Sequence, residues 1–173
     1  MKAVTDAVVR KATLQDLDAI GDLWVEFMDF HKRRDPHFAR AADGRRRFQD
    51  FISTHIVAHT SRVLVAEVRG RVVGYCLAVL SQYPPVFRNR DYGSVFDLAV
   101  TARFRRRGIG ARLYRAAEAW FADRRVRRIE LRIAVTNEVS TAFWRKMGFQ
   151  PFVTTLFETL TPRGRGMIQP ETP

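Results

Sequence analysis

The chain has 173 residues, enough for one domain with a full hydrophobic core. No apolar run approaches the ~18 residues of a membrane span, and the N-terminus lacks an apolar run of signal-peptide length. The single cysteine, Cys76, excludes an internal disulfide and fits a reducing compartment, so we expect a cytoplasmic protein. The net charge of +12 favours polyanionic partners: nucleic acid, an acidic partner or a polyphosphorylated cofactor.

The first third of the chain predicts a strand followed by two helices. After the strand at 7–12, Thr13 and Asp16 form an acidic variant of the helix-start signal, with a hydroxyl cap and a carboxylate in the first turn. Apolar residues at helical spacing then continue to Phe30, and a second helix is predicted over about 45–58.

The rest of the chain alternates strands and helices. Two β-rich runs joined by a glycine turn predict a hairpin, and a loop with two prolines follows it. The predicted order is strands 62–68 and 72–80, loop 83–93, a strand ending at Val100, helix 109–124, strand 127–135, helix 137–147 and one or two strands within 149–160. This pattern indicates a single α/β domain over residues 1–160 with a mixed, mostly antiparallel sheet, and a flexible C-terminal tail at 161–173.

The run Arg105-Arg106-Arg107-Gly108-Ile109-Gly110 lies between a predicted strand and a predicted helix. A glycine-rich turn entering a helix presents backbone N–H groups without intrahelical partners, together with the positive end of the helix dipole. Glycine also allows a ligand to approach the backbone closely. The run therefore predicts a pyrophosphate site, although a charged loop that simply starts a helix is the alternative when the run is taken alone.

Three segments in this order resemble the GCN5-related N-acetyltransferase (GNAT) family. Residues 96–100, Phe-Asp-Leu-Ala-Val, look like its fourth strand. Residues 105–110 fit its Arg/Gln-x-x-Gly-x-Gly/Ala acetyl-CoA loop position by position. The segment from Asn137 to Gly148-Phe149 looks like the one that closes the fold, and 10–16 look like the opening. The resemblance spans about residues 7–160.

The resemblance implies a sheet of about six to seven strands with helices on both faces and splayed fourth and fifth strands. It also implies direct transfer of an acetyl group from acetyl-CoA to an amine of a small molecule or peptide, without a metal, and makes a homodimer reasonable. The residues implied to bind the cofactor are Leu98, Ala99, Val100, Arg105, Arg106, Arg107, Gly108, Ile109, Gly110, Asn137 and Trp144.

Two positions depart from the family pattern. The usual acid, a tyrosine seven residues after the asparagine, is Trp144, whose indole N–H does not give up its proton at neutral pH. The glutamate that some members carry five residues before the asparagine is Arg132. Asp97 remains the best candidate for a base or amine-binding group, with a purely structural role equally open, and Tyr92 and Ser140 are weaker candidate proton donors.

Other candidate groups favour simpler explanations. His55 and His59 have the i, i+4 spacing of a metal pair but no third ligand, so solvent-facing histidines are expected. Trp24, Phe27 and His31 lie where the family forms its acceptor wall, but for Trp24 and Phe27 a role in the core is favoured. An acyl-CoA-binding regulator without catalysis and a basic nucleic-acid-binding protein are the second and third hypotheses after an acetyltransferase.

Overall fold

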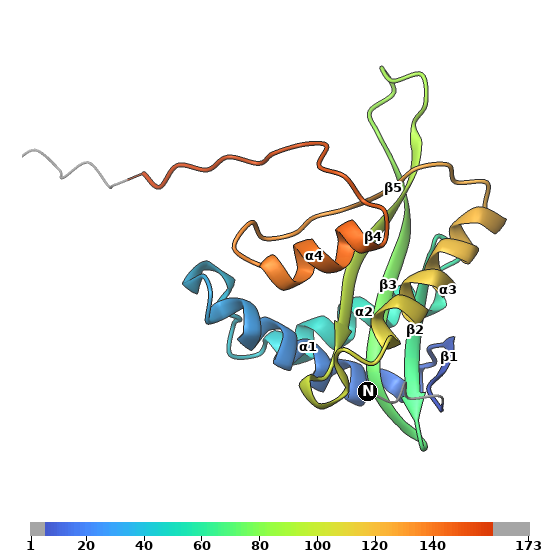
Figure 1. The fold of residues 1–173 in the computed structure, drawn as a ribbon, viewed down its shortest axis with the longest axis vertical. Coiled ribbons are helices and arrows are strands. Elements are labelled where there is room, and N and C mark those ends of the chain that lie inside the picture. Colours follow the sequence, from blue (N-terminus) through green and yellow to red (C-terminus); the bar gives the residue numbers. More distant parts are fainter. Residues whose placement is uncertain (1–5, 161–173) are drawn as a thin grey trace, which may run out of the picture.

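A computed structural model, which describes residues 6–160, shows one five-stranded sheet in the order β1-β2-β3-β4-β5 (Figure 1). The first three pairs are antiparallel and the last, β4 with β5, is parallel. The strands are β1 (Val8–Lys11), β2 (Ser61–Val68), β3 (Arg71–Gln82), β4 (Asp91–Val100) and β5 (Ile129–Leu131). The predicted mixed, mostly antiparallel α/β sheet is confirmed.

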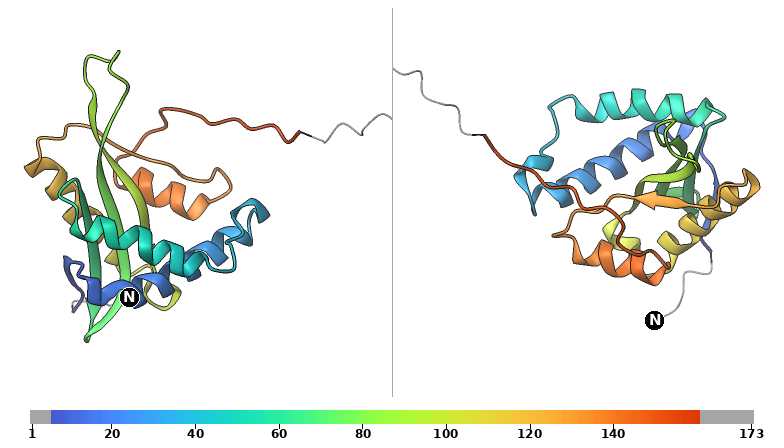
Figure 2. Two further views of the ribbon diagram at one scale, coloured as in Figure 1. Left: turned by 180° about the vertical axis from the view of Figure 1, so that it is seen from behind. Right: turned by 90° about the horizontal axis from the view of Figure 1, so that it is seen from above.

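Helices cover both faces of this sheet, as expected (Figure 2). One face packs on α1 (Leu17–Lys32) and α2 (Gly44–Val57), through a core that includes Ile20, Ile52 and Tyr75. The other face packs on α3 (Ile109–Asp123), which in turn supports α4 (Glu138–Lys146). Single 3₁₀ turns complete the fold: η1 (Leu14–Asp16), η2 (Pro36–Phe38) and η3 (Ala102–Phe104).

The expected count of six to seven strands is wrong, since the described residues form five. Residues 150–160 are exposed and have no regular secondary structure, because no neighbouring strand accepts or donates backbone hydrogen bonds there. The strand expected over 127–135 is reduced to Ile129–Leu131, and β4 begins at Asp91, inside the expected loop. The tail predicted at 161–173 lies outside the described residues.

The last strand pair is short, and this opens the sheet at one end. Hydrogen-bonded register between β4 and β5 runs only from Gly93 opposite Ile129 to Val95 opposite Leu131. On the other side of β4, Leu77 of β3 faces Asp97 while the adjacent Ala78 faces Val95, so one residue of β4 is bulged out of register. A bulge bends its strand and increases the local twist, so β4 leaves the line of β5 beyond this point. β5 therefore leaves β4 unpaired beyond Val95, as expected for two strands that splay.

Glu26 on α1 joins the end of β4 to the segment that follows it. Its carboxylate accepts hydrogen bonds from the Thr101 hydroxyl at 2.7 Å, the Ala102 amide at 2.7 Å and the Arg105 guanidinium at 3.0 Å. Arg105 also donates from Nε to the carbonyl of Val100 at 2.8 Å. These bonds fix the position at which the chain enters the Arg/Gly run.

Replacing Glu26 with Gln should lower the free energy of unfolding by about 1 to 2 kcal/mol, because charged hydrogen bonds to three groups are weakened. Chemical denaturation at pH 7 measures this, with Glu158→Gln as a control that removes the same charge from an exposed position. Equal stability of the two variants would contradict the structural role of Glu26.

Candidate active site

A cleft lies where β4 and β5 separate, and it collects residues from α1, β4, β5 and α4. Five of the residues expected at the site line this cleft, and none of residues 105–110 does. Its lining consists of Phe27, His31, Val95, Phe96, Asp97, Leu98, Leu131, Arg132, Ile133, Ala134, Asn137, Ser140 and Trp144. A second hollow between η1 and α2 is wider and open to solvent, but it lies away from the Arg/Gly run and from these residues.

The Arg/Gly run forms a turn with two left-handed residues directly before α3. Arg106 has φ of +61° and Gly108 has φ of +82°. Among the described residues, no backbone carbonyl accepts a hydrogen bond from the amides of residues 106–111. Alternating backbone handedness of this kind forms an anion-binding concavity, and the helix dipole of α3 adds to it. A Cβ built on Gly108 meets nothing within 4 Å, so the turn is open to a ligand at that position.

The arginines of this run differ in whether their guanidinium groups are already hydrogen-bonded within the chain. Arg106 and Arg107 are exposed. The guanidinium of Arg105 instead donates hydrogen bonds to Glu26 and to the Val100 carbonyl. Its backbone amide donates to the Ala102 carbonyl at 3.3 Å. In this structure Arg105 therefore positions the turn, while phosphate contacts are left to its neighbours.

The residues expected to hold the pantetheine arm lie on the part of β4 that β5 does not pair. Leu98 lines the cleft, Ala99 is buried toward α1 and α2, and the Val100 carbonyl accepts a hydrogen bond from Arg105.

The first two residues of α3 pack inside the molecule. Ile109 is 1% exposed and belongs to the core. A Cβ on Gly110 would lie 3.4 Å from Leu98 and 3.5 Å from Phe143, so only a small residue fits between α3, β4 and α4.

Asn137 caps α4 and faces the cleft at the same time. It is 5% exposed, and its Oδ1 accepts a hydrogen bond from the Ser140 amide at 3.1 Å. The Nδ2 group makes no hydrogen bond within the described chain, and Asn137 and Ser140 both line the cleft. Asn137 therefore caps α4 through Oδ1 and still has Nδ2 available for a ligand contact.

The two aromatic residues of the sequence hypothesis are placed differently. Trp144 is 7% exposed, packs edge-on against Tyr114 at 5.4 Å between ring centroids, and presents one side to the cleft. Tyr92 stacks on Tyr83 at 4.5 Å near the start of β4, five residues before Asp97. At about 3.3 Å per residue that is roughly 16 Å from Asp97, and Tyr92 does not line the cleft.

Asp97 is the carboxylate of the cleft. Burial raises its pKa to about 6, although the hydrogen bond from the Tyr75 hydroxyl, 3.2 Å from Oδ2, acts in the opposite direction. Oδ1 has no donor within the described residues, so one oxygen is held by Tyr75 and the other is free. A carboxylate with this pKa is ionised near neutrality and accepts a proton more readily than an ordinary aspartate.

His31 lines the cleft from α1 and is 9% exposed. Its ring packs between Phe27, at 4.5 Å, and Phe38, at 5.3 Å, and Nδ1 is buried without a hydrogen-bond partner. Burial lowers its pKa, and Arg34 lowers it further, so the imidazole is neutral at pH 7. Trp24 stacks on Phe48 at 4.7 Å in the core instead of lining the cleft.

Tyr75 and Glu26 were not singled out by sequence reasoning. Tyr75 lies in an apolar strand and Glu26 in an amphipathic helix, and each meets its partner only across the tertiary structure. No local pattern marks either residue.

Burial excludes Cys76 from chemistry at the surface. Its side chain is fully buried, and burial raises the pKa of its thiol well above the usual range.

No cluster of three or more His, Cys, Asp or Glu suited to a metal ion occurs among residues 6–160. Over the same residues, every helix is too short or too polar to cross a membrane.

Two proteins of related sequence are named as N-acetyltransferases. An uncharacterized N-acetyltransferase of Archaeoglobus fulgidus is 28% identical over 136 residues, covering 79% of this chain and 88% of that protein. An N-alpha-acetyltransferase of Sulfurisphaera tokodaii is 30% identical over 108 residues, covering 58% of this chain and 63% of that protein.

Solved structures share the fold. A tetramutant of the BH1408 protein from Bacillus halodurans superposes with a TM-score of 0.79 at 24% identity, covering 88% of this chain and 99% of that one. The aminoglycoside N-acetyltransferase AAC(6')-Iy in complex with CoA superposes with a TM-score of 0.68 at 17% identity, covering 89% and 94%. The acetyltransferase (GNAT) family matches residues 20–149, most of the chain, and the protein belongs to this family.

Proposed function

We propose that the protein transfers an acetyl group from acetyl-CoA to a primary amine of a small molecule or peptide, by direct attack in a ternary complex. The observation that carries this proposal is the turn at 106–111. Its backbone amides are free at the start of α3, and its Gly110 lies against Leu98, which lines the cleft that contains Asp97. Several of the structural neighbours are aminoglycoside acetyltransferases, which illustrates amine acceptors on this fold.

The residues present fit the donor. The free amides of the turn and the exposed Arg106 and Arg107 would hold the pyrophosphate, because backbone donors and guanidinium groups are preferred phosphate ligands. The unpaired edge of β4 at Leu98 and the Nδ2 group of Asn137 would hold the pantetheine arm. Acetyl-CoA supplies an acyl carbon on a good leaving group, so the chain needs no covalent nucleophile.

Asp97 would bind the acceptor as an ammonium ion and take its proton on Oδ1, which leaves the nitrogen lone pair free to react. Tyr75 would hold the carboxylate in place through Oδ2. Neutral His31 and Phe27 would form an uncharged wall beside it, so that the carboxylate is the group that attracts the amine.

Proton donation to the leaving thiolate does not fall to Trp144, because an indole N–H is not an acid at neutral pH. Of the two hydroxyl groups considered, only Ser140 lies at the cleft. A coenzyme A thiolate needs little acid assistance, so water or Ser140 would suffice.

Gly108→Asp should weaken binding of coenzyme A at least tenfold relative to Gly108→Asn. The two side chains have the same shape and both tolerate left-handed backbone better than most residues, so they differ mainly in a charge placed against the phosphates. Titration calorimetry with coenzyme A measures both affinities. Equal affinities for the two variants would show that the phosphates bind elsewhere.

Asp97→Asn should reduce kcat by about a hundredfold or more while coenzyme A affinity stays within about twofold. The wild-type kcat/KM should rise with pH through about 6, where Asp97 loses its proton, and the variant should lose this rise. Thiol release across a panel of amines measures the rates, with Asp91→Asn, on the same strand but outside the cleft, as control. An unaltered rate and pH profile would remove Asp97 from the mechanism.

The same substitution should stabilise the fold at neutral pH. A carboxyl whose folded pKa is raised binds its proton more tightly when folded, so it costs stability at every pH above its unfolded pKa. Asp97→Asn removes this cost, and we expect the free energy of unfolding at pH 7.5 to rise by roughly 2 kcal/mol. The gain should disappear near pH 4, and denaturation at the two pH values checks this.

An acyl-CoA-binding regulator without catalysis remains the second candidate, and the burial of Trp144 at the usual acid position is the observation that favours it. Coenzyme A binding without thiol release for any amine in the panel would support this alternative over the acetyltransferase.

A further inference from the structure

Arg132 is the arginine that lines the cleft, together with the carboxylate of Asp97. It follows β5 directly and is exposed. Among the described residues, no carboxylate pairs with its guanidinium and no oxygen accepts a hydrogen bond from it. Arg105 and Arg128, by contrast, are both paired with glutamates. A free guanidinium presents its N–H donors in a planar fork that matches a carboxylate, so Arg132 can bind an anionic group of a ligand.

Arg132 and Asp97 lie on the same face of the sheet. The last registered pair of the two strands joins Val95 to Leu131, so Arg132 is one residue beyond this pair and Asp97 two residues beyond it. Leu131 packs against the core under α3, and side chains alternate along a strand, so Arg132 belongs to the opposite face, that of α1. Asp97 belongs to this face as well, because Tyr75, in the core under α1 and α2, donates a hydrogen bond to it.

The two charged groups share the cleft without forming an ion pair with each other. Oδ1 of Asp97 has no donor among the described residues, and the guanidinium of Arg132 is free. Phe27 and His31 also line the cleft and carry no charge at pH 7, because burial lowers the pKa of His31. Opposite charges that face one cleft without contact can bind a zwitterion between them, with its ammonium group on the carboxylate and its carboxylate on the guanidinium.

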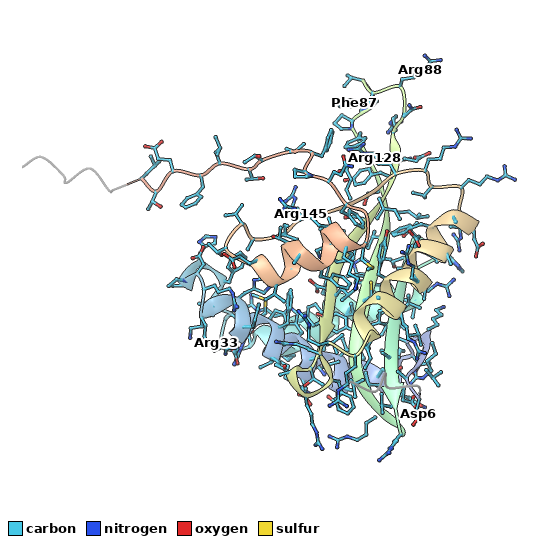
Figure 3. All side chains as sticks on the ribbon, viewed as in Figure 1. Asp6, Arg33, Phe87, Arg88, Arg128 and Arg145 are labelled. Carbon is cyan, nitrogen blue, oxygen red and sulfur yellow. The ribbon has the colours of Figure 1, made fainter. Side chains whose placement is uncertain are left out.

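The charges around the end of α1 also favour an acceptor with a negative group. Arg33 lies exposed at this end of the helix (Figure 3). The nearby carboxylates are already engaged: Asp29 pairs with Arg40 at 3.3 Å, and Asp35 accepts a hydrogen bond from a backbone amide of η2 at 2.9 Å. Glu138, exposed in the first turn of α4, does not line the cleft. An acceptor with several positive charges would therefore be repelled here, whereas a carboxylate would be attracted.

We propose that the acceptor is an amino acid, and that Arg132 binds its carboxylate while Asp97 binds its ammonium group. The inference rests on the acetyl transfer proposed above and names the acceptor class for it. The amine nitrogen would form a bond to the acetyl carbon and the carbon–sulfur bond would break. One ammonium proton would pass to Asp97 and a second to the sulfur, which gives an N-acetylated amino acid and coenzyme A. Arg132 touches the carboxylate and not the reacting atoms, so it determines specificity.

The position of Arg132 separates it from the phosphate site. The turn at 106–111 leads into α3, which covers the opposite face of the sheet, and none of residues 105–110 lines the cleft. The phosphates would have their own donors in that turn, as argued above. The guanidinium of Arg132 is therefore left for the acceptor.

Thiol release from acetyl-CoA tests the proposal with leucine, β-alanine and γ-aminobutyrate, each compared with its own amide, which keeps the amine and lacks the negative charge. The wild type should prefer the acid of at least one pair about tenfold or more in kcat/KM. Arg132→Gln should lose this preference and Arg132→Glu should reverse it. Arg127→Glu, an exposed position before β5 and outside the cleft, should keep it. Comparing the preference between variants removes any effect of the pKa of the amine itself.

Titration calorimetry of the same amino acids into protein saturated with coenzyme A measures binding without reaction. The preferred amino acid should bind Arg132→Glu at least tenfold more weakly than the wild type, with coenzyme A affinity within about twofold.

The outcomes distinguish the two proposals. Acetylation of amines without preference for the acid, or a preference that survives in Arg132→Gln, would overturn the acceptor class and leave the activity standing. Amino-acid binding that depends on Arg132 without thiol release for any amine would overturn the activity and support the binding site. A loss of coenzyme A affinity in Arg132→Glu with unchanged preference would place Arg132 at the donor and overturn the inference.

Discussion

The early end of the β4–β5 pairing is the constraint on which the rest of the site depends. Three residue pairs hold the two strands together, and the bulge that follows turns β4 away from β5. A longer pairing would close the cleft and would occupy the strand edge that we propose holds the pantetheine arm. The exposed side chain of Phe96 lies at the bulge itself, so the position where the sheet is weakest is also where it is open to a ligand.

Two carboxylates, Glu26 and Asp97, have different roles. Glu26 is outside the cleft and is satisfied by three donors, so it contributes to structure by holding the turn before α3 in place. Asp97 is inside the cleft with one donor, and burial raises its pKa to about 6. Burying the Asp97 carboxylate with one hydrogen-bond donor destabilises its ionised form, and this lowers the stability of the fold. For the same reason the carboxylate accepts a proton more readily than an exposed one.

The sequence between 149 and 160 has the composition of a strand, but the structure leaves the described part of it unpaired. Side-chain preference alone does not make a strand, because the backbone groups need a neighbour. The expectation of six to seven strands was wrong for this reason. Composition shows which segments favour a strand, but it does not show which of them find a neighbouring strand to pair with.

What the sequence determined by itself was local. The turn at Arg105–Gly110, the cap at Asn137 and the helices α1 to α4 follow from glycine, capping residues and apolar spacing, which act within a few residues of each other. The tertiary structure decided the rest. The hydrogen bond of Tyr75 to Asp97, the engagement of Arg105 by Glu26 and the absence of Tyr92 from the cleft join or separate residues that are distant along the chain or displaced along a strand. Burial and hydrogen bonding set the chemistry of such residues, and both exist only once the sheet and helices have packed.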